Sequence, residues 1–186
     1  VRMQEMRIKN IHLKYQRRMT ASRWGIFLVI IFVFYIFSGT GSFVKPLLLI
    51  PAALCISVNE DELISACTGV LCGLLTDISC GRLLGYNAVF LVAACVFSSL
   101  LFVNLLRRNI INVFIVTSVI VFLHGGLDYF LYYVIWSSDE NTSLIYYDII
   151  LPLCIMTSVS TLLLYPLIRA VRHKFTPERL QASIDL

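Results

Sequence analysis

The chain has 186 residues, of which 59% are hydrophobic and 14% are charged, and its mean hydropathy is +0.84. Soluble globular domains carry about a quarter charged residues, so this composition excludes an ordinary soluble protein. The apolar residues form long blocks, which predicts membrane-spanning helices rather than the alternating strands of an outer-membrane barrel.

Residues 1–23 form a basic leader before the first apolar block. Its apolar residues recur at roughly helical spacing, which suits a helix lying on anionic lipid. A disordered basic tail that only fixes orientation is the other interpretation. A nucleic-acid-binding arm is disfavoured, because the basic run abuts a predicted span. A cleavable signal peptide is not expected, since no small-residue cleavage site follows the first apolar block.

Six apolar blocks follow, and each is long enough, or nearly so, to cross a bilayer. Pro51 lies in the middle of the second block, where a kink is expected, and Pro152 lies inside the sixth. The acidic run 60–62 separates the second and third blocks and suits the start of the third helix. The predicted spans cover residues 24–38, 43–58, 63–78, 86–106, 110–135 and 144–168.

The net charge of +4 is unevenly placed. Thirteen of the 15 Lys and Arg residues lie in the leader, in the pair Arg107-Arg108, and in the tail after the last block. Six spans with both termini in the cytoplasm put all thirteen on the inner side, leaving Lys45 and Arg82 outside. The sequence therefore predicts an all-α, six-helix membrane protein with a leader (1–23), a transmembrane domain (24–168) and a cytoplasmic tail (169–186).

Glycines and one acid mark the junction of the third and fourth spans. Gly69 and Gly73 form a small-xxx-small pair that permits close helix packing. Gly81 and Gly85 repeat this spacing beyond Asp77. Because lipid does not tolerate an exposed charge, Asp77 and Arg82 should face protein or the interface, where Asp77 caps the helix break and pairs with Arg82.

A second polar group lies in the outer half of the predicted bundle. His124 and Asp128 are four residues apart and share a helix face, and Asp148 falls at a similar depth. One interpretation is structural, with Asp128 holding His124. The other is a cleft for a ligand or a partner helix, which Asp77 would also line.

Catalysis, metal binding and cofactor binding have weak support. The histidine and acid could orient Ser79 or Ser160 as a nucleophile, or relay protons, yet no hydrolase, zinc or phosphate-loop motif is present. The six cysteines form no C-x-x-C pair and suit small buried apolar positions. We expect no enzyme activity, no metal and no cofactor.

The run from Gly73 to Ala88 resembles the G-x-x-x-D-x-x-x-G-x-x-x-G-x-x-A signature of the rod-shape-determining protein MreD family. It supplies Gly73, Asp77, Gly81, Gly85 and Ala88 at the matching positions. The chain length, six spans and cytoplasmic termini are also similar to that family. The basic leader is longer than is typical of the family and the fifth helix is richer in tyrosine.

The resemblance implies a non-enzymatic scaffold of the cell-elongation complex, which makes peptidoglycan, in the bacterial cytoplasmic membrane. Its implied partners are an MreC-like protein, an MreB-like filament, and a RodA-type glycosyltransferase with its transpeptidase. The family is similar in fold to the substrate-capture subunits of energy-coupling-factor transporters. Capture of a vitamin-like molecule by the outer polar cluster is therefore the main alternative, and a lipid flippase is a third.

Overall fold

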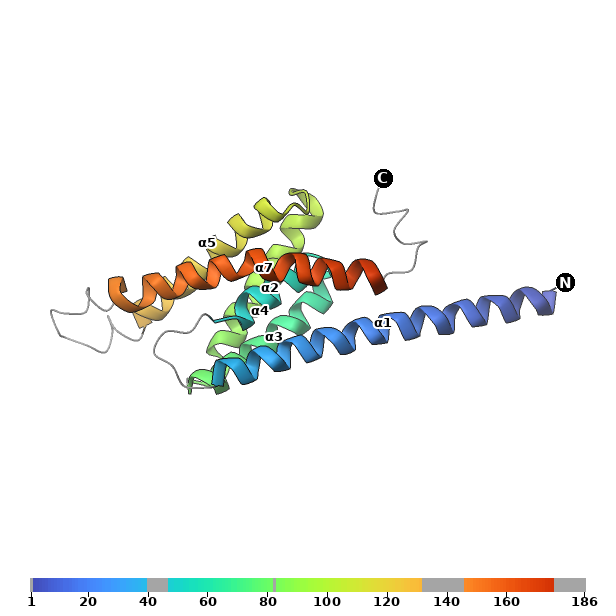
Figure 1. Cartoon of the computed structure of the whole chain (residues 1–186), viewed down its shortest axis with the longest axis horizontal. Helices are drawn as coiled ribbons and strands as arrows, with labels where there is room; N and C mark the ends of the chain where they lie inside the picture. Colours follow the sequence, from blue (N-terminus) through green and yellow to red (C-terminus); the bar gives the residue numbers. More distant parts are fainter. Residues whose placement is uncertain (1, 40–46, 82, 132–145, 176–186) are drawn as a thin grey trace. The chain divides into compact units, whose positions relative to one another are not determined.

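The computed structural model describes residues 2–39, 47–81, 83–131 and 146–175, and within these ranges the chain is helical, with no strand. Five of the helices are long and apolar enough to cross a membrane, as in a multi-pass membrane protein. The elements, labelled in Figure 1, are α1 (Arg2–Gly39), α2 (Leu49–Ser57), α3 (Glu62–Cys80), α4 (Tyr86–Asn104), α5 (Ile110–Tyr129), the π-helical turn η2 (Tyr146–Ile150) and α7 (Leu151–Phe175).

The described chain divides into two compact units. The larger unit, Ile31–Pro166, contains the end of α1, all of α2 to α5, η2 and most of α7. The smaller unit contains the described residues up to Ile30 and those from Leu167 onward. The polar groups predicted to be functional all belong to the larger unit.

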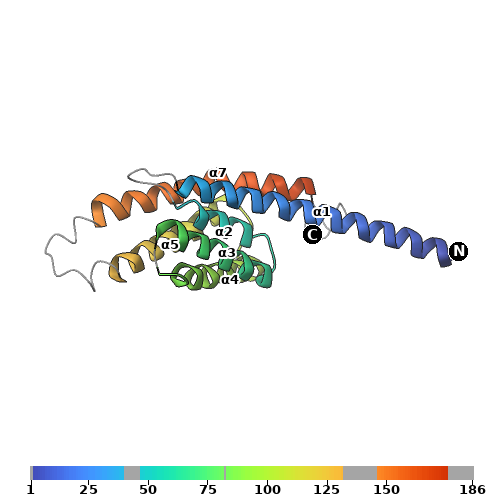
Figure 2. The ribbon, with the colours of Figure 1, turned by 90° about the horizontal axis from the view of Figure 1, so that it is seen from below.

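The tightest packing in the larger unit joins α3 to α4, which lie side by side as an antiparallel pair (Figure 1 and Figure 2). A Cβ added to Gly73 would lie 2.7 Å from the backbone nitrogen of Ala88, and one added to Gly69 would lie 2.9 Å from the carbonyl oxygen of Leu91. The two backbones therefore touch where glycine removes the side chain. Gly69 and Gly73 therefore lie at a close helix contact of the kind that a small-xxx-small pair permits.

Helix α2 is much shorter than the predicted span 43–58. Its nine residues are all buried, and at 1.5 Å per residue it is about 14 Å long. It contacts α3, α4 and α5, so it is enclosed by protein rather than by lipid. The expected kink at Pro51 is wrong: this residue lies in the first turn, where a proline has no intrahelical hydrogen bond to remove.

Helices α3, α4 and α5 start close to their predicted positions. Helix α3 begins at Glu62 after Asp61, as the acidic run indicated, and α4 ends two residues before the predicted Leu106. Beyond Leu131 the predicted fifth span lies outside the described residues. The last span opens as the π-helical turn η2. Pro152 explains the wider turn, because its ring cannot fit against the carbonyl four residues earlier in a regular α-helix.

Contacts at the ends of α5 show that α7 runs antiparallel to it. The Tyr165 hydroxyl donates a hydrogen bond to the Arg108 carbonyl, just before α5, at 2.9 Å. At the opposite end the rings of Tyr129 and Tyr146 meet edge to face, 5.0 Å between centroids. The larger unit therefore has an Arg108 end and a Tyr129 end.

The acidic connection between α2 and α3 lies at the Arg108 end and is more buried than expected for a loop. Asn59 and Glu60 are buried, whereas Asp61 is exposed. The Glu60 carbonyl accepts hydrogen bonds from the Ser65 hydroxyl at 3.5 Å and from the Ser99 hydroxyl at 2.9 Å. These two serines, from α3 and α4, fix the end of α2 against the α3–α4 pair.

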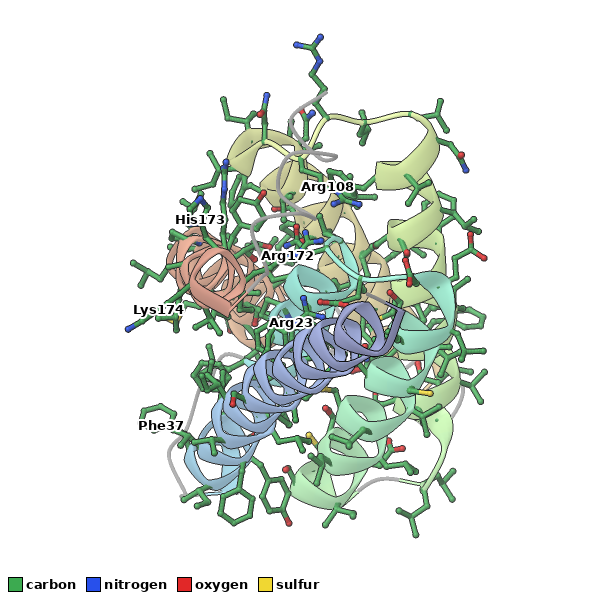
Figure 3. The ribbon with its side chains drawn as sticks, turned by 90° about the vertical axis from the view of Figure 1, so that its right-hand side faces the viewer. Arg23, Phe37, Arg108, Arg172, His173 and Lys174 are labelled. Atoms are coloured by element: carbon green, nitrogen blue, oxygen red, sulfur yellow. The ribbon has the colours of Figure 1, made fainter. Side chains whose placement is uncertain are left out.

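The smaller unit carries the basic termini. Helix α1 continues through Arg23 without a break, so the predicted leader and the first span are one helix. Trp24 and Phe27, near that junction, meet edge to face with centroids 5.8 Å apart. Figure 3 shows Arg172, His173 and Lys174 pointing in different directions from the end of α7.

Replacing Gly73 with alanine tests the contact between α3 and α4. The added Cβ would overlap the backbone of Ala88, and such overpacking costs about 1–3 kcal/mol of stability. Gly126→Ala is the matched control, because its Cβ would meet nothing within 4 Å and alanine favours a helix by about 1 kcal/mol. Thermal inactivation in detergent, followed by size-exclusion chromatography, should show a lower melting temperature for Gly73→Ala only. Equal melting temperatures would contradict the close contact.

Candidate functional site

Asp77 is the centre of the turn between α3 and α4. Its side chain is fully buried, and its two carboxylate oxygens accept separate backbone hydrogen bonds. Oδ2 accepts from the Gly85 N–H at 2.8 Å, and Oδ1 accepts from the Asn87 N–H at 3.1 Å. These are N–H groups of the first turn of α4, which have no partner inside the helix. Asp77 therefore caps the neighbouring helix, and its negative charge faces the positive end of that helix dipole.

Two glycines let the chain turn back onto Asp77. Gly81 follows α3 with φ 61° and ψ 31°, and Gly85 precedes α4 with φ 101°. These left-handed conformations favour glycine because it has no Cβ. A Cβ on either residue would meet nothing within 4 Å in the part of the chain that the structure describes, so neither glycine lies at a helix contact there. The two glycine pairs therefore differ in the structure: Gly69 and Gly73 lie at a helix contact, and Gly81 and Gly85 lie in the turn.

The predicted partner of Asp77 was Arg82, which lies outside the described residues. The structure instead assigns the Asp77 carboxylate to the backbone of α4. This arrangement satisfies two N–H groups that would otherwise be costly to bury at membrane depth. Asp77 thus makes the hydrogen bonds of a cap in the structure, and its pairing with Arg82 stays a prediction.

Asn87 connects this cap to the second polar group. Its backbone is bound by Asp77, and its side-chain Oδ1 lies 2.6 Å from His124 Nε2 on α5. The other ring nitrogen of His124, Nδ1, lies 3.6 Å from Asp128 Oδ2. Phe90 packs edge to face on the same imidazole, 5.0 Å between centroids. A buried polar chain thus runs from Asp77 through Asn87 and His124 to Asp128.

The geometry of this row of polar side chains limits the protonation state of His124. Both ring nitrogens face an oxygen, so both can act as donors only if the ring is a protonated imidazolium. The amide orientation of an asparagine is an assignment, and turning it over places Nδ2 against Nε2 of a neutral ring. As oriented, Asn87 Nδ2 has no hydrogen-bond partner among the described residues. The hydrogen bonds among Asn87, His124 and Asp128 therefore have two possible arrangements, one with a charged and one with a neutral imidazole.

The other candidate site residues, Asp148, Ser79 and Ser160, form no hydrogen bond or ion pair with the polar side chains from Asp77 to Asp128 in the described part of the chain. Asp148 lies exposed on η2, whereas His124 and Asp128 are buried, and the grouping of the three as one outer cluster stays a prediction. The Ser79 hydroxyl bonds the Leu75 carbonyl at 2.8 Å and the Ser160 hydroxyl bonds the Thr157 carbonyl at 2.6 Å, each within its own helix. Neither arrangement forms a serine–histidine pair.

A cavity of about 80 Å³ adjoins the polar chain. It lies among α2, α5, η2 and α7, and His124 and Asp128 supply charged or ionisable groups to its wall. Thr157 from α7 also lines it; its hydroxyl donates to the Leu153 carbonyl at 2.7 Å and accepts from the Leu47 N–H at 3.2 Å. The remaining wall is mainly apolar and includes Ile50, Ile150 and Cys154.

Sequence reasoning missed Asn87 and Thr157. Asn87 is a fully buried carboxamide in the first turn of a strongly apolar helix, which is the signal that could have identified it. Thr157 had no comparable signal, because hydroxyl groups are common in spans and usually bond their own helix. Its role depends on where α2 begins, and the sequence does not indicate this.

No metal site forms among the described residues, because no three His, Cys, Asp or Glu side chains come together suitably. All six cysteines are free thiols. Cys154 packs close to Gly125, where a Cβ would lie 2.5 Å from its sulfur, so it serves helix contact.

Comparison with known proteins gave no relatives: no family model, no curated protein and no solved structure matches the chain.

Replacing Asp77 with asparagine tests the cap. Asparagine keeps one acceptor oxygen but places an NH₂ group against a backbone N–H, and such a loss costs about 1–3 kcal/mol. Asp77→Leu removes both acceptors and should destabilise the protein further. Asp61→Asn is the control, because Asp61 precedes α3 without making a side-chain cap hydrogen bond to it. In thermal unfolding in detergent, Asp61→Asn should have the highest melting temperature of the three variants, Asp77→Asn a lower one and Asp77→Leu the lowest. If all three variants melt alike, Asp77 is not a cap.

Gly81 can be tested through its conformation. Asparagine tolerates the left-handed region, whereas valine does not, and the cost for an ordinary residue is about 1–2 kcal/mol. Gly81→Asn should therefore give nearly the wild-type yield of folded protein, and Gly81→Val a clearly lower one. The yield of monodisperse protein after chromatography is the measurement. Equal losses would mean that contact with another molecule, and not φ, selects glycine here.

Proposed function

We propose that the chain is a non-enzymatic scaffold subunit of the bacterial cell-elongation complex, in the cytoplasmic membrane. It has six crossings, counting α2 within the second, and cytoplasmic termini. The observation that carries the proposal is the use of the run Gly73 to Ala88, which resembles the MreD signature. The five signature positions of that run share three structural roles in one helix turn: backbone contact, helix capping and left-handed conformation.

The roles of these positions support a common design. Gly73 and Ala88 meet at the backbone contact of α3 and α4, Asp77 caps α4, and Gly81 and Gly85 adopt left-handed conformations. A chain selected for this turn needs just these residue types at these spacings. Each residue that matches the signature therefore has a structural reason to be in its place.

The ends of the larger unit support the proposed orientation. Arg107 and Arg108 mark one end, and the turn 81–85 approaches the opposite end through the link from Asn87 to His124. Placing the arginine end in the cytoplasm puts the turn and the cavity on the outer side. The short α2 fits within the second crossing, because protein encloses it and the Thr157 hydroxyl accepts a hydrogen bond from the Leu47 N–H.

The cavity beside His124 is small for the ligand of the vitamin-capture alternative. Pockets for drug-sized ligands occupy about 300–1,000 Å³. The cavity beside His124 measures about 80 Å³. Moreover, the Asp77 carboxylate predicted to line such a site is engaged by the backbone of α4. These observations favour recognition of partners by the outer surface of the bundle.

Affinity purification from native membranes tests the proposal. The tagged full chain, solubilised in mild detergent, should enrich an MreC-like protein or the RodA-type glycosyltransferase with its transpeptidase. Asp61→Asn should enrich them as well as the wild type, whereas Asp77→Leu should lose them as the α3–α4 pair loosens. A tagged membrane protein of similar size, expressed at the same level, measures the background.

Two results would contradict the scaffold role. One is repeated recovery of neither partner at quantities where the control variant is itself abundant. The other is stoichiometric recovery of a transporter coupling protein and its ATPases, which would support the capture alternative.

A further inference from the structure

Helix α1 is longer than a membrane crossing requires. It runs unbroken from Arg2 to Gly39, contains no proline, and its candidate membrane span begins only at Thr20 (Figure 1). Transmembrane helices tilt by about 20° on average, so an unbroken continuation of the span leaves the membrane surface instead of lying along it. The 18 residues of α1 before Thr20 therefore extend about 27 Å along the helix axis beyond the span.

Hydrophobic residues recur at coiled-coil spacing along one face of α1. Seven positions follow one another at steps of three or four residues, and the six steps cover 21 residues, which gives the mean of 3.5 typical of a heptad pattern. The positions hold Ile8, Ile11, Tyr15, Met19, Ser22, Ile26 and Val29. We call the first four, which precede the span, the leader stripe. At the span the same face is open, since Ser22 is exposed and Val29 is 62% exposed.

The described helices of the chain itself offer no matching partner for the leader stripe. Helices α3, α4 and α5 have 19 or 20 residues, and one bilayer crossing takes up this whole length. The end of α7 belongs to the smaller unit together with the leader, and its last turn is basic, with Arg172 and Lys174. Since apolar residues outside the bilayer gain free energy when they are buried, the leader stripe suits a helix from another molecule.

The charges around the leader stripe select an acidic occupant. Residues 1–23 contain seven Lys or Arg residues and one acid, Glu5, so their side-chain charge is +6. Arg7, Lys14 and Arg18 are each three or four residues from Ile11 or Tyr15, so their positions border the stripe on one side. A second copy of this chain would bring like charges together along the contact, which is costly at an interface. A helix with acids beside its apolar face complements both features.

We propose that the leader stripe forms a two-stranded coiled coil with an acidic amphipathic helix of another protein. The partner helix presents apolar residues at heptad spacing to the stripe and carries Asp or Glu opposite Arg7, Lys14 and Arg18. Positions 22, 26 and 29 continue the same face into the span, so the partner helix runs beside α1 toward the membrane. The inference goes beyond the scaffold role, because it defines the chemistry of one binding surface and holds whichever complex the chain joins.

The test uses the full chain in phosphatidylcholine nanodiscs and a designed peptide as the probe. The peptide is a fluorescein-labelled helix of three heptads, with leucine at the core positions and glutamate at the flanking positions. Fluorescence anisotropy should show saturable binding that weakens as the salt concentration rises. A peptide of the same composition in scrambled order should bind at least about tenfold more weakly, because its leucines do not share one face. The heptad peptide with lysine in place of glutamate should not bind.

Ile11→Ser and Leu13→Ser are matched variants that separate the leader stripe from the rest of the leader. Each removes one apolar side chain outside the span without changing the charge, and only position 11 belongs to the stripe. Ile11→Ser should weaken peptide binding by about tenfold, because burial of such a side chain contributes at least this factor. Leu13→Ser should bind the peptide as the wild type does.

Four results would overturn the proposal. Two are a lack of saturable binding and equal binding of the heptad and scrambled peptides. A third is a loss in Leu13→Ser as large as that in Ile11→Ser. The fourth is that another occupant covers the stripe. Peptide binding that disappears in nanodiscs containing phosphatidylglycerol, at equal ionic strength, would assign the stripe to anionic lipid, and a chain dimer that Ile11→Ser dissociates would assign it to a second copy. None of these measurements uses a cellular partner, so their failure is distinct from failure of the affinity purification.

Discussion

The Asp77 carboxylate, shared between two N–H groups of α4, is the interaction on which the rest of the larger unit depends. A helix that begins inside an apolar environment leaves its first N–H groups without partners, and each such group is expensive there. Asp77 satisfies Gly85 and Asn87 at once and offsets the burial of its own charge by these charge-assisted bonds. Since the acid belongs to α3, the same bonds fix the separation and register of α3 and α4.

Other parts of the structure follow from that register. With α4 held close, Gly73 faces Ala88 and Gly69 faces Leu91 at backbone contact. Asn87 then projects its amide toward α5, where His124 binds it and continues the polar chain to Asp128. The far ends of α3 and α4 present serine hydroxyls that hold the connection after α2. One capped turn thus positions both the packing of the short α2 and the ionisable wall of the cavity.

Much of this could be predicted from the sequence, and the failures have physical reasons. The helices α3, α4 and the start of α5 were predicted closely, because hydropathy blocks and polar breaks define spans at membrane depth. The length of α2 was not predicted, because a short helix enclosed by protein and a full membrane span have the same apolar composition. Gly73 and Gly81 look alike in a spacing pattern, although one avoids a clash and the other adopts a positive φ. Asn87, the partner of His124 on α4, was missed because a tertiary contact across 37 residues leaves no local pattern.

Amide hydrogen exchange of the Gly85 and Asn87 N–H groups tests the central claim most directly. The account predicts slow exchange at both positions in the wild-type chain in nanodiscs. In Asp77→Leu the exchange should become fast at these two positions, while the Ser65 amide, bonded to the Asp61 carbonyl at 2.8 Å in α3, stays protected. Fast exchange of Gly85 and Asn87 in the wild type, or protection that survives the loss of the carboxylate, would contradict the account.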